Sequence, residues 1–304
     1  MCTECGGICC YADDSTYTVT ANTPEELTTK LDDKFKVMSK YLTDNQLCIN
    51  SDKTHILVMS TRQKKRKSKQ TQTQVTLNTG KEVILPTRTE TLLGFKVHDS
   101  MSFSEHLMDN KESLIKILNK RIGALKQLRK AASFKAKLNI ANGIIMSKIL
   151  YLLPLYGGCP EYLLSAIQTK QNEAMRQVTG RRWVVPGKQF VSTSDLLKQC
   201  GWLSVRQLSF YTTVLSVHNT LVHKTPEYLY NKLTGGHCQR TRAAAIYKVE
   251  RTCVDEARLK IASESYRWRG HQQHSMIPTS LKDETNINYF KIRLKLWVKE
   301  NISI

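Results

Sequence analysis

Residues 9–19, with the sequence CCYADDSTYTV, constrain the fold of this chain more than any other segment. Two adjacent acids, Asp13 and Asp14, stand between an apolar run and an alternating run that contains Tyr17 and Val19. This pattern predicts a β-hairpin with Ala-Asp-Asp-Ser at its tip. Carboxylates beside apolar strands cost stability unless a positive charge meets them. A divalent cation would serve, and Mg²⁺ binds carboxylate oxygens together with substrate phosphates.

The overall charge of the chain indicates a polyanionic partner. The 304 residues can form two ordinary domains, and 40% hydrophobic residues suffice for a core. A net charge of +20 exceeds what solubility needs, so it favours nucleic acid first and an anionic membrane surface second. No apolar run has the length of a membrane-spanning helix, and no secretory signal is recognisable. The expected location is therefore the nucleus or cytoplasm, not the secretory route.

The cysteines and histidines offer a weak alternative, a zinc site. Nine cysteines, widely spread, argue against a disulfide framework and fit a reducing compartment. The cluster Cys2, Cys5, Cys9 and Cys10 has no second pair at zinc-finger spacing, so structural or accidental cysteines are the favoured interpretation. His271 and His274 have no partnering cysteines either. We expect them in a solvated loop.

The first hundred residues predict a small layer of strands and one helix, hence an α+β class. Thr23 and Pro24 begin a helix, as cap and first residue, that runs to about residue 43 and covers one face of a sheet. Strands are expected at residues 48–50, 56–60 and 92–97, with a hairpin formed by residues 75–77 and 82–85. Between them, residues 62–69 hold six basic side chains. They suit a nuclear localisation signal or a phosphate-contacting loop, and equally a solvated charge run.

From residue 104 the pattern becomes helical, with one basic face. Nine basic residues and a single acid, Glu112, lie between Asn110 and Lys137. An apolar stripe recurs at helical spacing on the other side, at Leu107, Leu114, Leu118, Ile122, Leu125 and Leu128. A merely soluble helix mixes charges of both signs. A face of one sign suits contact with successive phosphates.

The rest of the chain predicts further helices at residues 135–153, 161–178, 193–200, 205–222, 226–233 and 287–300. Ser204 and Gln207 form a capping box at the start of one of them. Residues 237–280 are basic and read as irregular. Trp183, Trp202 and Tyr211 are expected to pack in the core, with base stacking the less favoured role.

Four motifs resemble, in order, those of reverse transcriptases from non-LTR (LINE-type, Jockey-like) retrotransposons. The first is the Tyr-x-Asp-Asp box at Tyr11–Asp14. The others are LCINSDKTH at 47–55, LLGFKVHDSMSFSEHL at 92–107, and the pair QNEAMRQVTG at 171–180 and GWLSVRQ at 201–207. A looser similarity continues to YFKIRLKLW at 289–297. The resemblance covers the chain from the box through the thumb and the C-terminal helical region.

The resemblance implies a domain order and a chemistry. It implies a partial palm at 1–103, a basic helical thumb at 104–180 and a helical, basic C-terminal region at 181–304. In the family, two Mg²⁺ ions held by palm aspartates drive nucleotidyl transfer. Asp13 and Asp14 match those ligands, and Lys53 matches a lysine that protonates pyrophosphate. Leu93 and Gly94 match the primer-grip turn. From spacing alone, Lys53 would be a solvated turn residue, and the other two a simple strand turn.

The resemblance also implies partners: an RNA template, a DNA primer and dNTP, with no membrane. The residues expected to contact nucleic acid are Lys111, Lys116, Lys120, Lys126, Arg129, Lys130 and Lys137. The oligomeric state is left open by the sequence.

Three functions remain open at this point. The family polymerase needs a third aspartate upstream of the box, so we expect a C-terminal part of a reverse transcriptase that is inactive alone. The second alternative is a catalytically inactive retroelement remnant that binds nucleic acid through its basic thumb. The third is a scaffold or peripheral membrane-surface protein. Against the third stands the expectation that no helix combines a basic face with bulky exposed aromatic residues.

Overall fold

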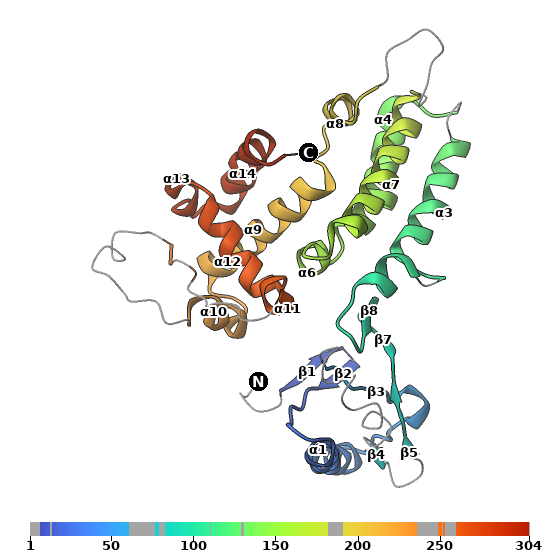
Figure 1. The fold of residues 1–304 in the computed structure, drawn as a ribbon, viewed down its shortest axis with the longest axis vertical. Coiled ribbons are helices and arrows are strands. Elements are labelled where there is room, and N and C mark those ends of the chain that lie inside the picture. Colours follow the sequence, from blue (N-terminus) through green and yellow to red (C-terminus); the bar gives the residue numbers. More distant parts are fainter. Residues whose placement is uncertain are drawn as a thin grey trace. The chain divides into compact units, whose positions relative to one another are not determined.

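The computed structural model describes residues 7–12, 14–60, 77–78, 83–109, 111–128, 131–181, 191–235, 249–250, 252 and 260–303. The chain divides into two compact units, Met1–His106 and Leu107–Ile304. In the described part, every strand lies in the first unit, and the second unit consists of helices and loops (Figure 1). This arrangement agrees with an α+β class. The predicted boundaries after residues 103 and 180 stay predictions.

Short strands and one long helix form the first unit. The elements are β1 (Ile8–Tyr11), β2 (Asp14–Tyr17), α1 (Pro24–Asp44), the 3₁₀ helix η1 (Ser51–Lys53), β3 (Ile56–Leu57), β4 (Leu77–Asn78), β5 (Val83–Ile84), β6 (Pro86–Thr87), β7 (Thr89–Leu92) and β8 (Phe95–His98). Among the described residues, the strands pair two by two: β1 with β2, β4 with β5 and β7 with β8 are antiparallel, and β3 with β6 is parallel. The predicted hairpin of residues 75–77 and 82–85 is confirmed where it is described, in the antiparallel pair β4 and β5, while residues 75, 76 and 82 lie outside the described residues.

Three predictions for this unit are corrected. Residues 48–50 form no strand. Residues 92–97 are not one strand but the centre of the β7–β8 hairpin, because the chain reverses at Leu93 and Gly94. The helix α1 covers the strands only in part: it contacts β4, but none of its residues is buried. The basic residues 62–69 lie outside the described residues.

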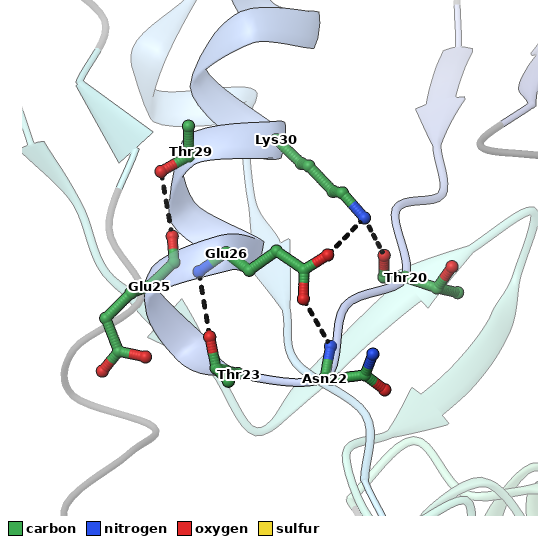
Figure 2. A network of polar contacts seen from close by, with 7 residues as sticks. All are labelled: Thr20, Asn22, Thr23, Glu25, Glu26, Thr29 and Lys30. Carbon is green, nitrogen blue, oxygen red and sulfur yellow. Dashed lines mark hydrogen bonds and ion pairs between the residues drawn. The ribbon is translucent and has the colours of Figure 1, made fainter.

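Polar contacts fix the start of α1 (Figure 2). The hydroxyl of Thr23 accepts a hydrogen bond from the Glu26 backbone N–H at 3.2 Å, as expected for an N-cap. The Glu26 carboxylate accepts from the Asn22 N–H at 3.0 Å and pairs with Lys30 at 2.6 Å. Lys30 also donates to the Thr20 carbonyl at 3.3 Å. These bonds tie the segment that follows β2 to the first turn of the helix.

The second unit is built around one helix, α9 (Val205–His223), which packs against α6, α7, α10, α12 and α14. The other elements are the π-helix η3 (Glu105–Asp109, which begins at the end of the first unit), α3 (Leu114–Gln127), α4 (Phe134–Ala141), the π-helix η4 (Asn142–Met146), α5 (Ser147–Leu150), α6 (Leu153–Tyr156), α7 (Glu161–Thr179), α8 (Thr193–Cys200), α10 (Glu227–Thr234), α11 (Lys260–Ser263), α12 (Tyr266–Met276), α13 (Thr279–Lys282) and α14 (Ile287–Asn301). Buried residues occupy most of the surface of α9, as expected for a central helix, and Asn219 and His223 remain exposed near its end.

Most predicted helices of this unit are confirmed, and three predictions are wrong. The helix expected at 135–153 ends at Leu150, and Leu152 then adopts a positive φ of 56° before α6. The stretch 237–280 contains α11, α12 and the start of α13, so it is not irregular throughout. His274 is buried on α12 instead of lying in a solvated loop, because its ring stacks against His218 of α9.

Among the expected core aromatics, Trp202 is buried and its ring N–H donates to the Asn142 side chain at 2.9 Å. This confirms its packing role. Tyr211 lies half-buried on α9, and Trp183 lies outside the described residues. Within the described ranges, no helix has both the length and the apolar character needed to span a bilayer.

A buried guanidinium joins α12 to α6. Arg269 is 7% exposed and donates from Nη2 to the Pro154 carbonyl, while its Nε and Nη1 have no hydrogen-bond partner in the structure. Burial lowers the pKa of Arg269 to about 10. A Cβ at Gly158 would overlap both Nη1 of Arg269 and the backbone carbonyl of Glu264. Glycine at position 158 is therefore a packing requirement.

We expect Gly158→Ala to destabilise the second unit by about 1–3 kcal/mol, because overpacking displaces the buried arginine and a backbone carbonyl. The matched control is Gly123→Ala in α3, where a Cβ meets nothing within 4 Å. The control should stabilise by about 0.5–1 kcal/mol through helix propensity. Urea denaturation followed by tryptophan fluorescence measures both, and equal effects of the two variants would contradict the packing argument.

A second prediction concerns pH and the first unit. Burial, and secondarily the charge of Lys96, lowers the pKa of His106 to about 4. Its Nδ1 accepts from the Lys96 N–H at 3.3 Å, and its ring lies against Phe95. The unfolded chain takes up a proton near pH 6.5, before the folded chain does. Stability from this site is thus complete above pH 6.5 and is lost as the pH falls toward 4.

Hydrogen exchange of peptides from β7 and β8, corrected for intrinsic rates, should reveal this loss. His106→Gln should flatten the pH dependence, whereas His223→Gln, at an exposed position in the second unit, should leave it unchanged. An unchanged pH profile in His106→Gln would remove His106 as the cause.

Candidate nucleic-acid interface

The hairpin expected around the two acids is present, and its tip is tighter than predicted. Tyr11 of β1 pairs with Asp14 of β2, which leaves Ala12 and Asp13 as the connecting residues. Ala12 has a positive φ of 52°, the left-handed conformation common in two-residue hairpin turns. Asp13 itself lies outside the described residues. Asp14 therefore belongs to a strand and not to the turn.

The acid-bearing strands are exposed. All four residues of β1 are exposed, and Tyr11 is 66% exposed. The Asp14 side chain is exposed too. Burial beside apolar strands was the reason to expect a compensating cation, and this structure does not provide that burial. The hairpin offers instead an accessible carboxylate next to an accessible tyrosine.

The described residues do not by themselves assemble a metal site. No group of three or more His, Cys, Asp or Glu side chains that could hold a metal ion occurs among them. Of the two expected Mg²⁺ ligands, only Asp14 is described. A Mg²⁺ ion at this tip would need Asp13 and, as is common for this metal, phosphate oxygens of a substrate.

Lys53 lies in the first unit, at the end of η1, and is exposed. The side chain of Asn50 accepts from the Asp52 N–H at 3.0 Å, and the Thr54 hydroxyl donates to the Asn50 carbonyl at 2.8 Å. These local bonds shape the turn. Among the described residues, no hydrogen bond or ion pair joins Lys53 to the acid hairpin.

Leu93 and Gly94 form the two-residue turn between β7 and β8. Both have positive φ, 49° and 76°, as a type I′ turn requires. Glycine adopts this conformation without strain, whereas leucine pays for its Cβ. Leu93 is also 43% exposed. Because the turn is exposed, another molecule can contact it. A primer-grip role requires such accessibility.

The helix α3 separates an apolar face from a basic face. Leu114, Leu118, Ile122 and Leu125 are buried, and α3 packs against α7. Lys116, Lys120 and Lys126 are exposed, as is Lys111 shortly before the helix. With a rise of about 1.5 Å per residue, Lys116 and Lys126 are separated by about 15 Å along the axis. No carboxylate of the described residues forms an ion pair with any of these four lysines.

Two other basic residues of this region, Lys137 and Arg121, do not join the exposed row. Lys137 is buried, with 7% exposure, and cannot face a ligand in this conformation. Arg121 is half-buried and donates to the Ile144 carbonyl, which ties α3 to η4. Arg129 and Lys130 lie outside the described residues. The expected set of seven thus reduces to four described, exposed lysines.

One polar cluster was not singled out in the sequence. Nδ1 of His98 lies 3.1 Å from Oδ1 of Asp99 and 2.6 Å from the Ser100 hydroxyl. The acid and the hydroxyl contact the same ring nitrogen, so the histidine cannot relay a proton between them as in a catalytic triad. The Asp99 N–H donates to the Arg88 carbonyl at 2.9 Å. This cluster shapes the turn after β8.

The strain at Leu93 gives a prediction. Leu93→Asn should increase the protection of β7 and β8 from hydrogen exchange, because asparagine tolerates the left-handed region better than leucine. Gly94→Ala should decrease it, with a cost of about 1 kcal/mol. Hydrogen exchange with mass spectrometry measures both changes. Two variants that shift protection in the same direction would contradict the type I′ assignment.

Comparisons of the sequence and the fold with known proteins found no match. No family model matches the sequence, no curated protein matches it, and no solved structure matches the fold. Any function is therefore inferred from the residues and geometry described above.

Proposed function

We propose that this protein binds the phosphate backbone of nucleic acid through the lysine row of α3, defined as Lys111, Lys116, Lys120 and Lys126. The observation that carries the proposal is a helix face of exposed lysines without described carboxylate partners, on a helix whose opposite face is buried. Because the helix is anchored by its apolar side, its lysines are presented at fixed spacing. Each phosphate they neutralise releases condensed counterions, which favours binding.

The proposal extends to the origin of the chain. We infer a reverse transcriptase of the non-LTR retrotransposon type, with an RNA template, a DNA primer and dNTP as partners. The motif order supports this inference, as do the exposed Tyr11–Asp14 pair and the tight turn at Leu93 and Gly94. Asp13 and Asp14 would hold Mg²⁺, which supplies nucleotidyl-transfer chemistry when bound. A nuclear or cytoplasmic location goes with this function.

The lysine row is tested by a double variant, Lys116→Ala/Lys120→Ala. The two residues lie one turn apart on α3, so they should contact neighbouring phosphates. We expect weaker binding to a labelled duplex and a slope of log K against log[salt] reduced by about 2, one for each lost contact. Fluorescence anisotropy over a salt series measures both quantities, with a single strand of equal length as comparison.

The matched control is Lys198→Ala/Lys232→Ala, which removes the same charge from exposed positions on α8 and α10. The control should retain the salt slope of the unaltered protein within about 0.5. Equal losses in both double variants would mean that net charge alone attracts nucleic acid, and the α3 site would then be rejected.

The polymerase inference has its own test, primer extension on an RNA template with Mg²⁺ and dNTP. For these 304 residues alone we expect no extension, because the family chemistry needs a third palm aspartate beside Asp13 and Asp14, and none of the motifs in this sequence supplies one. Extension that is lost in Asp13→Asn and Asp14→Asn would prove the expectation of inactivity wrong and establish the enzyme. Binding through α3 is independent of this result.

A further inference from the structure

The outer face of α14 carries an exposed apolar stripe. Tyr289, Ile292 and Leu296 are 53%, 62% and 55% exposed, although all three have large apolar side chains. Their spacing of three and four residues places them on one side of the helix. Isolated exposed apolar residues are common, but three in a row along one helix face indicate a contact surface. We call these three residues the α14 stripe.

Basic residues flank the stripe on both sides. Lys291, Lys295 and Lys299 follow one edge at four-residue intervals and are all exposed. On the other edge, the Arg293 guanidinium lies 5.6 Å from the centre of the Tyr289 ring. No carboxylate of the described residues pairs with the three lysines. Glu300, in the last turn, is the only acid of the helix.

The opposite face of α14 holds the helix in place. Phe290, Leu294 and Val298 are fully buried, and Phe290 stacks on His218 of α9 with ring centres 3.7 Å apart. At the C-terminal end, the Gln207 side chain donates to the Ile302 carbonyl at 2.9 Å. The stripe is therefore preorganised, which lowers the entropy cost of binding a partner.

The sequence predicted that no helix combines a basic face with bulky exposed aromatic residues, and on α14 only Tyr289 is an exposed aromatic, beside the aliphatic Ile292 and Leu296. Such a face can meet a membrane, a nucleic acid or a protein. A membrane favours a wider apolar face than three residues, and single-stranded nucleic acid favours aromatic platforms, whereas two of the three residues here are aliphatic. Apolar residues at three- and four-residue spacing with flanking charges are typical of a helix that packs against another helix.

We propose that the α14 stripe is a docking surface for an amphipathic helix of another protein, with acidic residues beside its apolar face. Charge complementarity selects this partner, because Arg293 and Lys295 would face carboxylates across the seam. A second copy of this chain is disfavoured, because its α14 would bring like charges together. At about 22 Å in length, the helix offers a small interface, typical of transient complexes.

The test uses synthetic helical peptides and the full chain. The probe is a dye-labelled peptide of three heptads with leucine at the a and d positions and glutamate at e and g, and the comparison peptide has lysine at e and g. We expect the glutamate probe to bind about tenfold more tightly than the lysine peptide. Ile292→Ser/Leu296→Ser keeps the net charge and should weaken the glutamate probe about tenfold.

The matched control is Leu150→Ser/Leu155→Ser, which alters two exposed leucines of α5 and α6 and should change the affinity less than about twofold. Lys295→Glu, at an exposed site where folding is not at risk, should shift preference toward the lysine peptide. Lys116→Ala/Lys120→Ala should bind the glutamate probe normally, which separates this surface from the α3 row.

Three outcomes would overturn the proposal. One is equal binding of the glutamate probe by the unaltered chain and by Ile292→Ser/Leu296→Ser. Another is a result in which the unaltered chain binds phosphatidylserine vesicles but not the glutamate probe, and Ile292→Ser/Leu296→Ser no longer binds the vesicles. The occupant of the stripe would then be a membrane. The third is binding of a single-stranded oligonucleotide, but not of the glutamate probe, that is lost in the same variant. The stripe would then be part of a nucleic-acid site.

Discussion

The extensive burial of α9 is the constraint on which the second unit depends, although Arg206, Asn219 and His223 are exposed. Buried positions Gln207 to Phe210 follow one another without interruption, so over this turn every side of the helix meets another element. Five helices provide those contacts. Its buried polar groups need partners as well: the Ser209 hydroxyl donates to the Gly157 carbonyl at 3.2 Å, and Nε2 of His218 donates to the Glu284 carbonyl at 2.7 Å. The surrounding helices turn their apolar faces toward α9, so charged residues can occupy their outer faces.

The first unit has a different basis. Its buried hydrophobic residues in the described part are Ile56, Leu77 and Phe95, a small core for so long a stretch of chain. Its geometry follows mainly from backbone conformation and local hydrogen bonds, such as the Thr23 cap and the Leu93–Gly94 turn. A chain that is shaped by turns and caps presents its polar tips, including Asp14, to the solvent. Because this core is small, α1 has half-buried residues but none that is fully buried.

The sequence predicted best the features that local chemistry decides. The helix at Thr193–Cys200, the capping box of Ser204 and Gln207, and the presence of the acid hairpin, though not its exact turn, all depend on residues close in sequence. Burial was harder to predict, because distant segments decide it. Lys137 looks like its exposed neighbours in sequence yet is buried, and His274 is enclosed only because α9 brings His218 against it. The α14 stripe was not predicted, because the apolar residues of this helix were assigned to the single face that packs on the helical body. The exposed apolar residues on its outer face were not distinguished from them.

The docking of α14 onto α9 also orders the motions of the molecule. On the buried face of α14, we expect amides to exchange with solvent mainly through openings in which the Phe290 ring leaves His218, because Phe290, Leu294 and Val298 close that face. In the first unit, the two-stranded ladders open by fraying, without the loss of a core. Amide hydrogen exchange should therefore occur at two rates. It should be slow in the helical unit, which opens cooperatively, and fast in the hairpin that carries the two acids.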